Sequence, residues 1–466
     1  MIKITTSTNE PLYKQIYLQL KEDILCGHMS YNKRLPATRT LAQQLNVSRN
    51  TINMAYRQLE IEGFVSAKQS SGYYVNKIST LHQSLPKYSK NTNREEFKPK
   101  IKYNFQHGTI DSTTFPISKW KKCLNYANDV IYDSSKFTSI EKEGLYELRS
   151  SIANHLYEAR GVDCTPEEVV ITSGHQNSLE ILSKLFINSE YSFSMEDPGY
   201  NVTRNAFEHL NYKMNFISLE DDGICIDEVK TLSSTLLCVT PSHQFPMGAV
   251  LPITKRIDLL YWANENNSYI IEDDYDSELR YHSLLIPSLY SLDINKRTIY
   301  LGTFSKSLSP DLRISYMVLP PPIFSKYQES YKICSNPVSK IIQLSMSKFI
   351  RDSDYEKHLN MIRTFYGKKN NLLISSILKY FKNDAEILGG DAGLHIIIRF
   401  KFSLDREKLI KKAVSNHILL YPLDILWANP SQSPDNLIIL GFGSIKSEDM
   451  EDAVKQLYKI VNDSIL

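Results

Sequence analysis

The chain has 466 residues, which is too long for one ordinary domain of about 100 to 200 residues, so its length predicts two to four folding units. With 42% hydrophobic, 23% charged and 11% aromatic residues, its composition is that of a globular protein and excludes a mainly disordered or collagen-like chain. No run approaches the roughly 18 apolar residues of a membrane span, and no signal-peptide block follows the first residues. We therefore expect a cytoplasmic protein.

The six cysteines are scattered, without a C-x-x-C pair or a histidine at ligand spacing, which predicts reduced thiols, no disulfide framework and no metal site. The formal net charge is only +2, but it is unevenly distributed. Residues 1–100 hold 15 Lys and Arg against 7 Asp and Glu, a net charge of +8, which leaves −6 for the rest. A basic head on a mildly acidic body predicts a polyanionic partner for the head alone.

Composition divides the chain into a head over residues 1–76, a linker over residues 77–100 and a body over residues 101–466. The linker is polar, rich in serine, asparagine and lysine, and lacks sustained periodicity. In the body, strand-like runs at 169–172, 236–240, 269–272 and 298–302 alternate with helical stretches. That alternation predicts an α/β domain with a mostly parallel sheet.

The head has the pattern of a winged helix-turn-helix. Apolar residues recur every four positions from Leu12 to Ile24, which predicts a packing helix over residues 11–26. A short helix over residues 38–45 and a longer helix capped by Ser48 follow, joined by a tight turn. Four side chains at the start of the longer helix are candidates for contacts with DNA: Arg49, Asn50, Thr51 and Asn53. Long donors and short amides of this kind can reach phosphates and base edges in a major groove.

Two short β-type runs after Gly63 enclose a Ser-Ser-Gly turn and predict a hairpin that forms the wing. Lys68 and the flexible backbone at Gly72 suit a neighbouring groove or phosphate, a contact that positions the protein more than it specifies sequence. On these patterns alone, a small helical interaction domain with a solvated basic face remains an alternative.

Four segments of the head resemble the GntR-type winged helix. They read Pro-Leu-Tyr-Lys-Gln-Ile at 11–16, Leu-Pro-Ala-Thr-Arg at 35–39, Val-Ser-Arg-Asn-Thr at 47–51 and Leu-Glu-Ile-Glu-Gly-Phe-Val at 59–65. The resemblance covers the whole head. The DNA contacts that it implies are Arg39, Arg49, Asn50, Asn53 and Gly72.

A lysine that follows a strand marks a candidate cofactor site in the body. Lys306 ends the run Thr-Ile-Tyr-Leu-Gly-Thr-Phe-Ser-Lys, and Arg313 follows seven residues later. A lysine so placed can form a Schiff base with an aldehyde cofactor, while the hydroxyls of Thr303 and Ser305 and the guanidinium of Arg313 can hold a phosphate. Upstream, the strand 269–275 ends in carboxylates and a phenol. Such a carboxylate keeps a pyridine ring protonated, and a phenol beside the ring oxygen tunes the imine.

Two further segments fit the same ligand. Residues 169–178 contain a strand, a Gly turn and a helix start, whose free N–H groups favour a phosphate. Tyr200, on the turn Glu-Asp-Pro-Gly-Tyr, can stack on a flat ring. Each feature also has an ordinary interpretation as a surface lysine, a strand end or a core tyrosine, but their joint occurrence favours the cofactor site.

These motifs resemble those of the fold-type I aminotransferases, as do the segments that begin at 105 (Phe-Gln-His-Gly-Thr-Ile-Asp), 240 (Thr-Pro-Ser-His-Gln-Phe-Pro-Met-Gly) and 390 (Gly-Asp-Ala-Gly-Leu-His). A GntR-type head joined to such a body resembles the MocR/GabR family of transcription regulators. The resemblance implies pyridoxal 5'-phosphate (PLP) as cofactor. It places Lys306 at the aldehyde, Asp273 at the pyridine nitrogen, Tyr275 at the ring oxygen and Tyr200 on the ring face. The phosphate set that it implies is Gly174, His175, Gln176, Thr303, Ser305 and Arg313.

Three positions depart from the pattern of working aminotransferases. Phe245 stands in place of an asparagine near the ring oxygen, and Ser444 in place of the arginine that binds the substrate carboxylate. Ser444 cannot form a bidentate carboxylate clamp, and Val202 occupies the place of a second expected arginine. We interpret Arg204 and Arg399 as ordinary surface or strand-end residues. These departures argue against a GABA-like effector and favour a sensor of PLP itself, as in PdxR-type regulators, over a sensor of a PLP-amine adduct.

The sequence thus predicts a PLP-dependent, sequence-specific DNA-binding transcription regulator of vitamin B6 or amino-compound metabolism. The resemblance implies a domain-swapped, head-to-tail homodimer in which a ligand in the body shifts the placement of the head. Two alternatives remain open. One is a working aminotransferase with an appended DNA-binding module, against which Phe245 and Ser444 count, since they allow at most a weak half-transamination. The other is a body that binds no cofactor.

Overall fold

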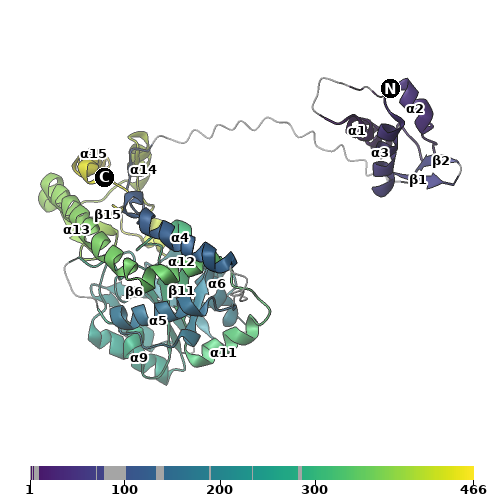
Figure 1. Ribbon diagram of the computed structural model, residues 1–466. Helices are drawn as coiled ribbons and strands as arrows, with labels where there is room; N and C mark the ends of the chain where they lie inside the picture. Colours follow the sequence, from purple (N-terminus) through teal and green to yellow (C-terminus); the bar gives the residue numbers. More distant parts are fainter. Residues whose placement is uncertain are drawn as a thin grey trace. The chain divides into compact units, whose positions relative to one another are not determined.

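The computed structural model describes residues 2, 4, 10–69, 71–77, 101–132, 141–187, 190–233, 235–281 and 286–466. Its contacts divide the chain into two compact units, Met1–Phe97 and Lys98–Leu466, each described here by itself (Figure 1). The predicted linker, apart from Lys77, lies outside the described residues. Among the helices in the described ranges, none combines the length and apolarity needed to cross a bilayer.

The smaller unit contains three helices and a hairpin. The elements are α1 (Leu12–Leu25), α2 (Thr38–Gln44), α3 (Arg49–Ile61), β1 (Val65–Lys68) and β2 (Gly72–Val75). The hairpin is antiparallel, with Val65 opposite Val75 and Lys68 opposite Gly72. The hydroxyl of Ser48 accepts the backbone N–H of Thr51 at 3.2 Å and so caps α3, as the sequence predicts.

The core of the smaller unit is formed by the apolar faces of these helices. The buried side chains of α1 and α3 include Ile16, Leu20, Ile24, Ile52, Ala55, Tyr56 and Leu59. The Tyr56 hydroxyl donates to the carbonyl of Pro36 at 2.9 Å, which ties α3 to the turn before α2. Because the apolar face of α3 is anchored in this way, its first turn is left at the surface.

The larger unit is built on an eight-stranded sheet with the order β4–β11–β10–β9–β8–β5–β6–β7. The strands are β4 (Val169–Thr172), β5 (Ser192–Asp197), β6 (Met214–Glu220), β7 (Gly223–Ile224), β8 (Thr235–Val239), β9 (Tyr269–Asp274), β10 (Thr298–Thr303) and β11 (Ser315–Val318). Strands β6, β5, β8, β9 and β10 run parallel, β11 is antiparallel to β10 and β4, and β7 is antiparallel to β6. The predicted α/β class with a mostly parallel sheet is confirmed.

Helices cover both faces of this sheet (Figure 1). They are α4 (Ile117–Tyr132), α5 (Tyr146–Arg160), α6 (His175–Leu185), α7 (Asn201–Glu208), α8 (Ile226–Lys230), α9 (Ile253–Glu265), α10 (Leu289–Leu292), α11 (Pro321–Ser330) and α12 (Lys340–Arg351). Successive residues of β8 alternate between two apolar clusters: Leu236 packs in the cluster that contains α6 residues, and Leu237 in the one that contains α9 residues. A sheet covered on both faces explains why strands such as β4 and β8 are buried along their whole length and mostly apolar.

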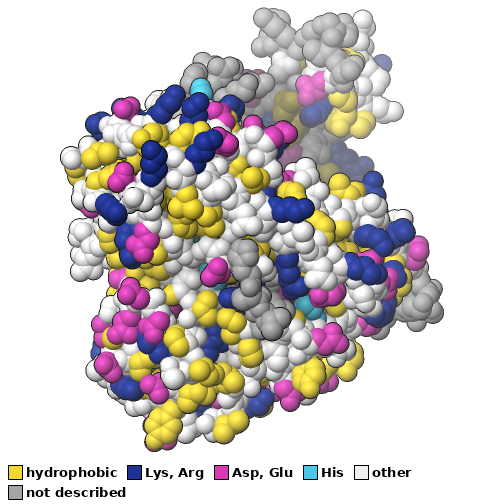
Figure 2. All heavy atoms as spheres, turned by 90° about the vertical axis from the view of Figure 1, so that its left-hand side faces the viewer, with side chains coloured by type: hydrophobic (Ala, Val, Ile, Leu, Met, Phe, Trp, Pro, Cys, Tyr) yellow, Lys and Arg dark blue, Asp and Glu magenta, His cyan; other side chains and the backbone are white. Residues whose placement is uncertain are grey.

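The rest of the larger unit carries a three-stranded antiparallel sheet and long helices. Its elements are α13 (Asp354–Phe381), β12 (Ala385–Leu388), β13 (His395–Phe400), α14 (Arg406–Ser415), β14 (Ile418–Leu419), β15 (Leu437–Gly441) and α15 (Met450–Asn462). The two-residue strand β3 (Tyr103–Asn104) pairs in parallel with β14, and the N–H of Gly441 donates to the carbonyl of Phe105 at 2.8 Å. Basic, acidic and hydrophobic side chains are interspersed on the face of this unit seen in Figure 2.

Candidate cofactor site and DNA-binding surface

A cavity of about 250 Å³ lies at the carboxyl ends of β9 and β10, the edge at which open α/β sheets bind ligands. Its lining residues are His107, His175, Gln176, Tyr200, Val202, Thr240, Phe245, Asp273, Tyr275, Thr303, Ser305, Lys306, Pro310 and Arg313. Nine of the ten cofactor-binding residues predicted from the sequence are among them. The tenth, Gly174, packs against Arg313. The structure therefore brings the whole predicted set together.

Lys306 lies in the turn after β10, held in place by the buried neighbours Phe304 and Leu308. Removal from water lowers the pKa of Lys306 to about 8, and the negative charge of Asp276 opposes this effect. An appreciable share of the amine is therefore unprotonated near neutral pH. An unprotonated amine is the form that attacks an aldehyde.

Asp273 lies on β9 with its side chain 4% exposed. One carboxylate oxygen is 3.1 Å from Nε2 of His175, and the other has no hydrogen-bond partner among the described residues. A buried oxygen without a donor at the cavity wall fits the N–H of a protonated pyridine ring. The side chain of His175, predicted as part of the phosphate set, contacts Asp273, whereas its backbone begins α6.

The residues predicted to hold a phosphate lie at one end of the cavity. Thr303 Oγ1 lies 2.9 Å from Ser305 Oγ and accepts from Ser315 Oγ at 2.7 Å. Gly174, at φ +86°, precedes the first turn of α6, and a Cβ there would lie 2.7 Å from the Arg313 guanidinium. Hydroxyls, a guanidinium and free helix N–H groups together suit a phosphate. The Gln176 side chain instead donates to Glu180 of α6 at 3.0 Å.

Aromatic rings form another wall of the cavity. The ring centroids of Tyr200 and Phe245 are 5.6 Å apart, and those of Phe245 and Tyr275 are 6.0 Å apart, both pairs edge to face. Burial raises the pKa of Tyr200 to about 12 and the pKa of Tyr275 well above its usual value of 10. Both phenols are therefore protonated at neutral pH. Phe245 gives this wall an apolar side chain at the position where the resemblance to working aminotransferases implies an asparagine.

A cluster of three imidazoles beside Tyr275 was not predicted from the sequence. His243 Nδ1 is 2.9 Å from Asp276 Oδ2, and His395 Nε2 is 3.0 Å from the Pro246 carbonyl. The ring of His107 lies 4.8 Å from that of His395. Burial lowers the pKa of His395 to about 3 and that of His107 well below 6.5. A signal was available, since each histidine lies in one of the segments that carry the family resemblance.

The structure offers no spare cation for a substrate carboxylate among the residues that it describes around the cavity. Ser444 Oγ donates to the Asn104 carbonyl at 3.3 Å, and Val202 lines the wall. Arg204 donates to the Ile425 carbonyl at 2.7 Å, and Arg399 pairs with Glu386 at 3.1 Å. Lys306 and Arg313 are the Lys and Arg residues in the described lining.

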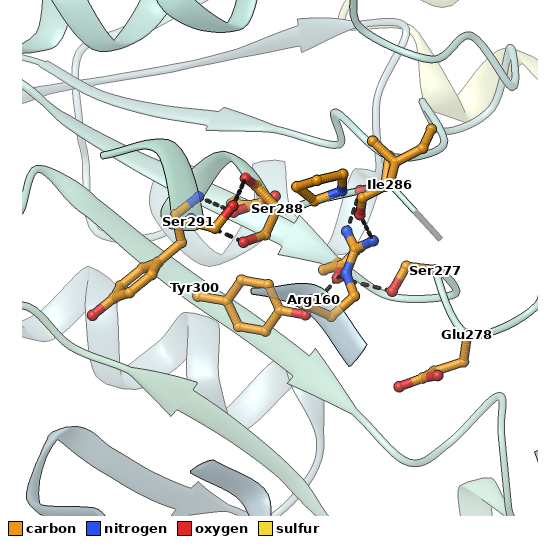
Figure 3. A network of polar contacts seen from close by, with 12 residues as sticks. Arg160, Ser277, Glu278, Ile286, Ser288, Ser291 and Tyr300 are labelled. Atoms are coloured by element: carbon orange, nitrogen blue, oxygen red, sulfur yellow. Dashed lines mark hydrogen bonds and ion pairs between the residues drawn. The ribbon is translucent and has the colours of Figure 1, made fainter. Parts of the chain in front are cut away.

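A buried ion-pair network supports β9 from the face opposite Asp273. Arg160, at the end of α5, donates from Nε to Asp274 Oδ2 at 2.9 Å and also to the Ile286 carbonyl (Figure 3). The hydroxyls of Tyr300 and Ser277 donate to the same carboxylate. Alternation along the strand thus points Asp274 toward α5 and Asp273 toward the cavity.

The smaller unit exposes most of the predicted DNA contacts on α2, at the start of α3 and on the hairpin. Arg39, Arg49, Asn50, Asn53, Lys68 and Gly72 are exposed. Thr51 is half-buried, with its hydroxyl 2.9 Å from that of Ser48 in the helix cap. The Lys68 ammonium donates to Asn32 at 3.0 Å and lies 4.3 Å from the centre of the Tyr74 ring, so it is already engaged. Arg34, not predicted from the sequence, packs against Gly72 and adds a cation beside the wing.

Comparison with known proteins identifies both parts of the chain. Residues 12–75 match the bacterial regulatory proteins of the gntR family, and residues 101–425 match aminotransferase class I and II. The chain is 36% identical, over 96% of each chain, to the uncharacterized HTH-type transcriptional regulator YdeL of Bacillus subtilis (strain 168). It is 29% identical to the probable rhizopine catabolism regulatory protein MocR of Rhizobium meliloti, over 98% of this chain and 95% of that one.

A third relative is the HTH-type pyridoxine biosynthesis transcriptional regulator PdxR of Corynebacterium glutamicum, 27% identical over 100% of this chain and 98% of that one. Among solved structures, the multiple substrate aminotransferase of Thermococcus profundus is similar with a TM-score of 0.70 and 22% identity. The match covers 78% of this chain and 92% of that chain, and it shows the fold.

Proposed function

Because the chain belongs to the MocR/GabR-type transcriptional regulators, in which a gntR-family helix-turn-helix is joined to an aminotransferase class I and II domain, we propose that it binds PLP at Lys306 and that PLP itself is the signal that changes its binding to promoter DNA. Residues 1–76 would form the DNA-binding domain and residues 101–466 the PLP-binding domain, joined by the linker 77–100. The protein would act in the cytoplasm.

The observation that carries this proposal is the distribution of cations in the cavity. Lys306 serves the aldehyde end and Arg313 the phosphate end, and no further Lys or Arg is present in the described lining. A volume of about 250 Å³ is also below the range of about 300 to 1,000 Å³ typical of small-molecule pockets. The site therefore suits one small phosphorylated ring better than a ring joined to an amino acid.

Different residues of the chain would bind different parts of PLP. Asp273 would accept the pyridine N–H, the first turn of α6 with Thr303, Ser305 and Arg313 would bind the phosphate, and Tyr200 would cover the ring. Tyr275 would lie on the side of the ring oxygen. When bound, PLP supplies an aldehyde for the neutral amine of Lys306 and a ring that withdraws electrons. The aromatic wall at Phe245 would keep water from one side of the ring.

The regulatory role follows from the relatives. Vitamin B6 metabolism is the best candidate for the controlled process, because PdxR is named for pyridoxine biosynthesis and is similar along its whole length. We further propose a head-to-tail homodimer in which PLP changes the placement of the heads. PLP can do so only if it binds the DNA-competent and DNA-incompetent arrangements with different affinity.

A gel shift of the cofactor-free protein on DNA from upstream of its own gene and the neighbouring gene tests the proposal, at fixed salt concentration and without added amine. We expect the affinity to change when PLP alone is added, and Lys306→Ala to bind the DNA but ignore PLP. Binding that ignores PLP until an amine is supplied would refute PLP as the signal. Multiple-turnover exchange of an amine for a keto acid would instead support the aminotransferase alternative.

A further inference from the structure

The segment of the chain just before α2 pairs with the free edge of the wing hairpin. Arg34 forms an antiparallel bridge with Tyr74 of β2. The N–H of Leu35 donates to the carbonyl of Tyr73 at 2.9 Å. The backbone of Arg34 is therefore fixed to the wing and moves with it.

Side chains on these paired segments alternate between two faces. One face points into the core, where Leu35, Val65 and Val75 are buried. Because successive residues of a strand point to opposite faces, their neighbours in the register lie on the outer face. We call this outer surface the wing face and define it by four residues: Arg34, Lys68, Gly72 and Tyr74.

The guanidinium of Arg34 lies against the backbone of Gly72 at the end of the hairpin. Its Nε, Nη2 and Cζ atoms are 3.4, 3.6 and 3.9 Å from the point where a Cβ of Gly72 would stand. Gly72 has φ +103°, a conformation that other residues adopt only with strain. The wing therefore ends in bare backbone with a planar cation beside it.

The two cations of the wing face differ in how they are held. The Lys68 ammonium donates to Asn32 at 3.0 Å and lies 4.3 Å from the centre of the Tyr74 ring. Arg34 is exposed, and its guanidinium makes no hydrogen bond or ion pair with any residue in the described part of the head. Its N–H donors are thus available for a ligand with acceptor groups.

The shape of the wing face suits the minor groove of DNA. The minor groove is about 6 Å wide against about 12 Å for the major groove, so it admits bare backbone and single side chains more readily than a hairpin with bulky residues. A·T-rich segments have the narrowest minor grooves and the strongest negative potential. Arginine suits such a groove better than lysine, because its guanidinium is planar and more weakly hydrated.

We propose that Arg34 inserts its guanidinium into the minor groove of A·T-rich promoter DNA, beside the backbone at Gly72, and so makes the head sensitive to what the floor of that groove displays. The inference rests on the proposed function in one respect, that the smaller unit binds promoter DNA. It does not depend on PLP as the signal.

The test places an obstacle in the minor groove alone. The base 2,6-diaminopurine, in place of adenine, adds an amino group there and leaves the major-groove edge of the base pair unchanged. A fragment from upstream of the gene is amplified once with adenine and once with diaminopurine nucleotides. Gel shifts of the full-length protein on both fragments are run at fixed salt concentration, with or without PLP, whichever gives the tighter binding of the wild type.

We expect diaminopurine to weaken binding of the wild type about tenfold. Arg34→Ala should bind the unmodified fragment about tenfold more weakly than the wild type and show no further loss on the modified one. Arg34→Lys keeps the charge but not the planar group, so it should recover only part of the affinity. Arg49→Ala is the matched control: its predicted contact lies in the major groove, so binding should weaken on both fragments with the wild-type ratio between them.

Three outcomes would overturn the inference. They are a wild type that binds both fragments equally, an Arg34→Ala variant that keeps the wild-type ratio, and an Arg34→Lys variant that binds as tightly as the wild type, which would leave only a phosphate contact. Should Arg34→Ala fail to fold, the ratio in Arg34→Lys decides, and a wild-type ratio there would overturn the inference. A wild type that binds neither fragment would instead refute the proposed function.

Discussion

Replacement of Arg160 by leucine tests how the larger unit holds the end of β9 that carries Asp273. Arg160 is 1% exposed and donates to Asp274 at 2.9 Å and to Ser242 at 2.6 Å. Leucine leaves the Asp274 carboxylate buried with only hydroxyl donors, and removal of one partner of a buried pair costs about 3 to 5 kcal/mol. We therefore expect the free energy of unfolding of the larger unit to fall by about 4 kcal/mol at pH 7.

The decrease in the free energy of unfolding of Arg160→Leu should depend on pH, and the charges of the network set its direction. Without Arg160 the pKa of Glu272 rises further, because Arg160 is a cation that lowers it. Glu272 in the same network already has its pKa raised to about 7, first by burial and then by Asp274. A carboxyl group with a raised folded pKa destabilises most at high pH, and this cost is relieved as pH falls through that pKa. The difference between variant and wild type should be largest above the Glu272 pKa of about 7 and should narrow as pH falls toward and below that value.

Urea unfolding followed by tryptophan fluorescence measures this quantity, because all three tryptophans of the chain lie buried in the larger unit: Trp120, Trp262 and Trp427. Arg256→Leu is the matched control. Arg256 is 2% exposed and donates to three backbone carbonyls at 2.8 Å. Its replacement therefore removes no hydrogen bond from a buried carboxylate. A loss below about 1 kcal/mol in Arg160→Leu, or the same pH profile in both variants, would refute the reasoning.

Three further variants test the two sites. Lys306→Ala should abolish the absorbance band of bound PLP and leave DNA binding without PLP unchanged; a persistent band would place the cofactor elsewhere. Arg49→Ala should weaken DNA binding by about 1 to 3 kcal/mol with an unchanged PLP spectrum, as measured by gel shifts at several salt concentrations; loss of the PLP spectrum would contradict separate sites. Gly174→Ala should lower PLP affinity about tenfold in equilibrium dialysis, because its Cβ would lie 2.7 Å from Arg313. Gly27→Ala, at φ +77° in open space, should leave that affinity unchanged.

Local sequence patterns predict well those elements whose formation depends on interactions between residues close in sequence. The cap at Ser48 and the hairpin strands coincide with the predicted ones, because hydroxyl capping and alternation act over a few residues. The strand predicted from the run 269–272 and from the longer segment 269–275 is β9, which spans Tyr269–Asp274. A run of three acidic residues argues against a buried strand. Here Arg160 and His175 supply the partners that make burial possible.

The candidate site was predicted as a set of residues, but not its internal contacts. Lys306 and Asp273 can be recognised because each follows or ends a strand in a motif of its own. The contact of His243 with Asp276 joins two segments more than 30 residues apart, and His395 approaches from a separate sheet. Such contacts depend on the order of the strands in the sheets. This order cannot be deduced from the spacing of motifs along a single sequence. The contact between His175 and Asp273 was missed for the same reason.

The pairing of β3 with β14 has a mechanical consequence. The chain enters the larger unit at residue 101, pairs at Tyr103 and Asn104, and reaches the cavity wall at His107. The carbonyl of Phe105 also holds Gly441, three residues before Ser444. A force applied to the chain before residue 101 would therefore reach the wall of the cavity through only seven residues, 101–107. It would also reach the strand that ends at Gly441. Tension in the chain and a ligand in the cavity would both act on the segment 101–107. The two can therefore oppose or reinforce each other's effect on the position of this segment.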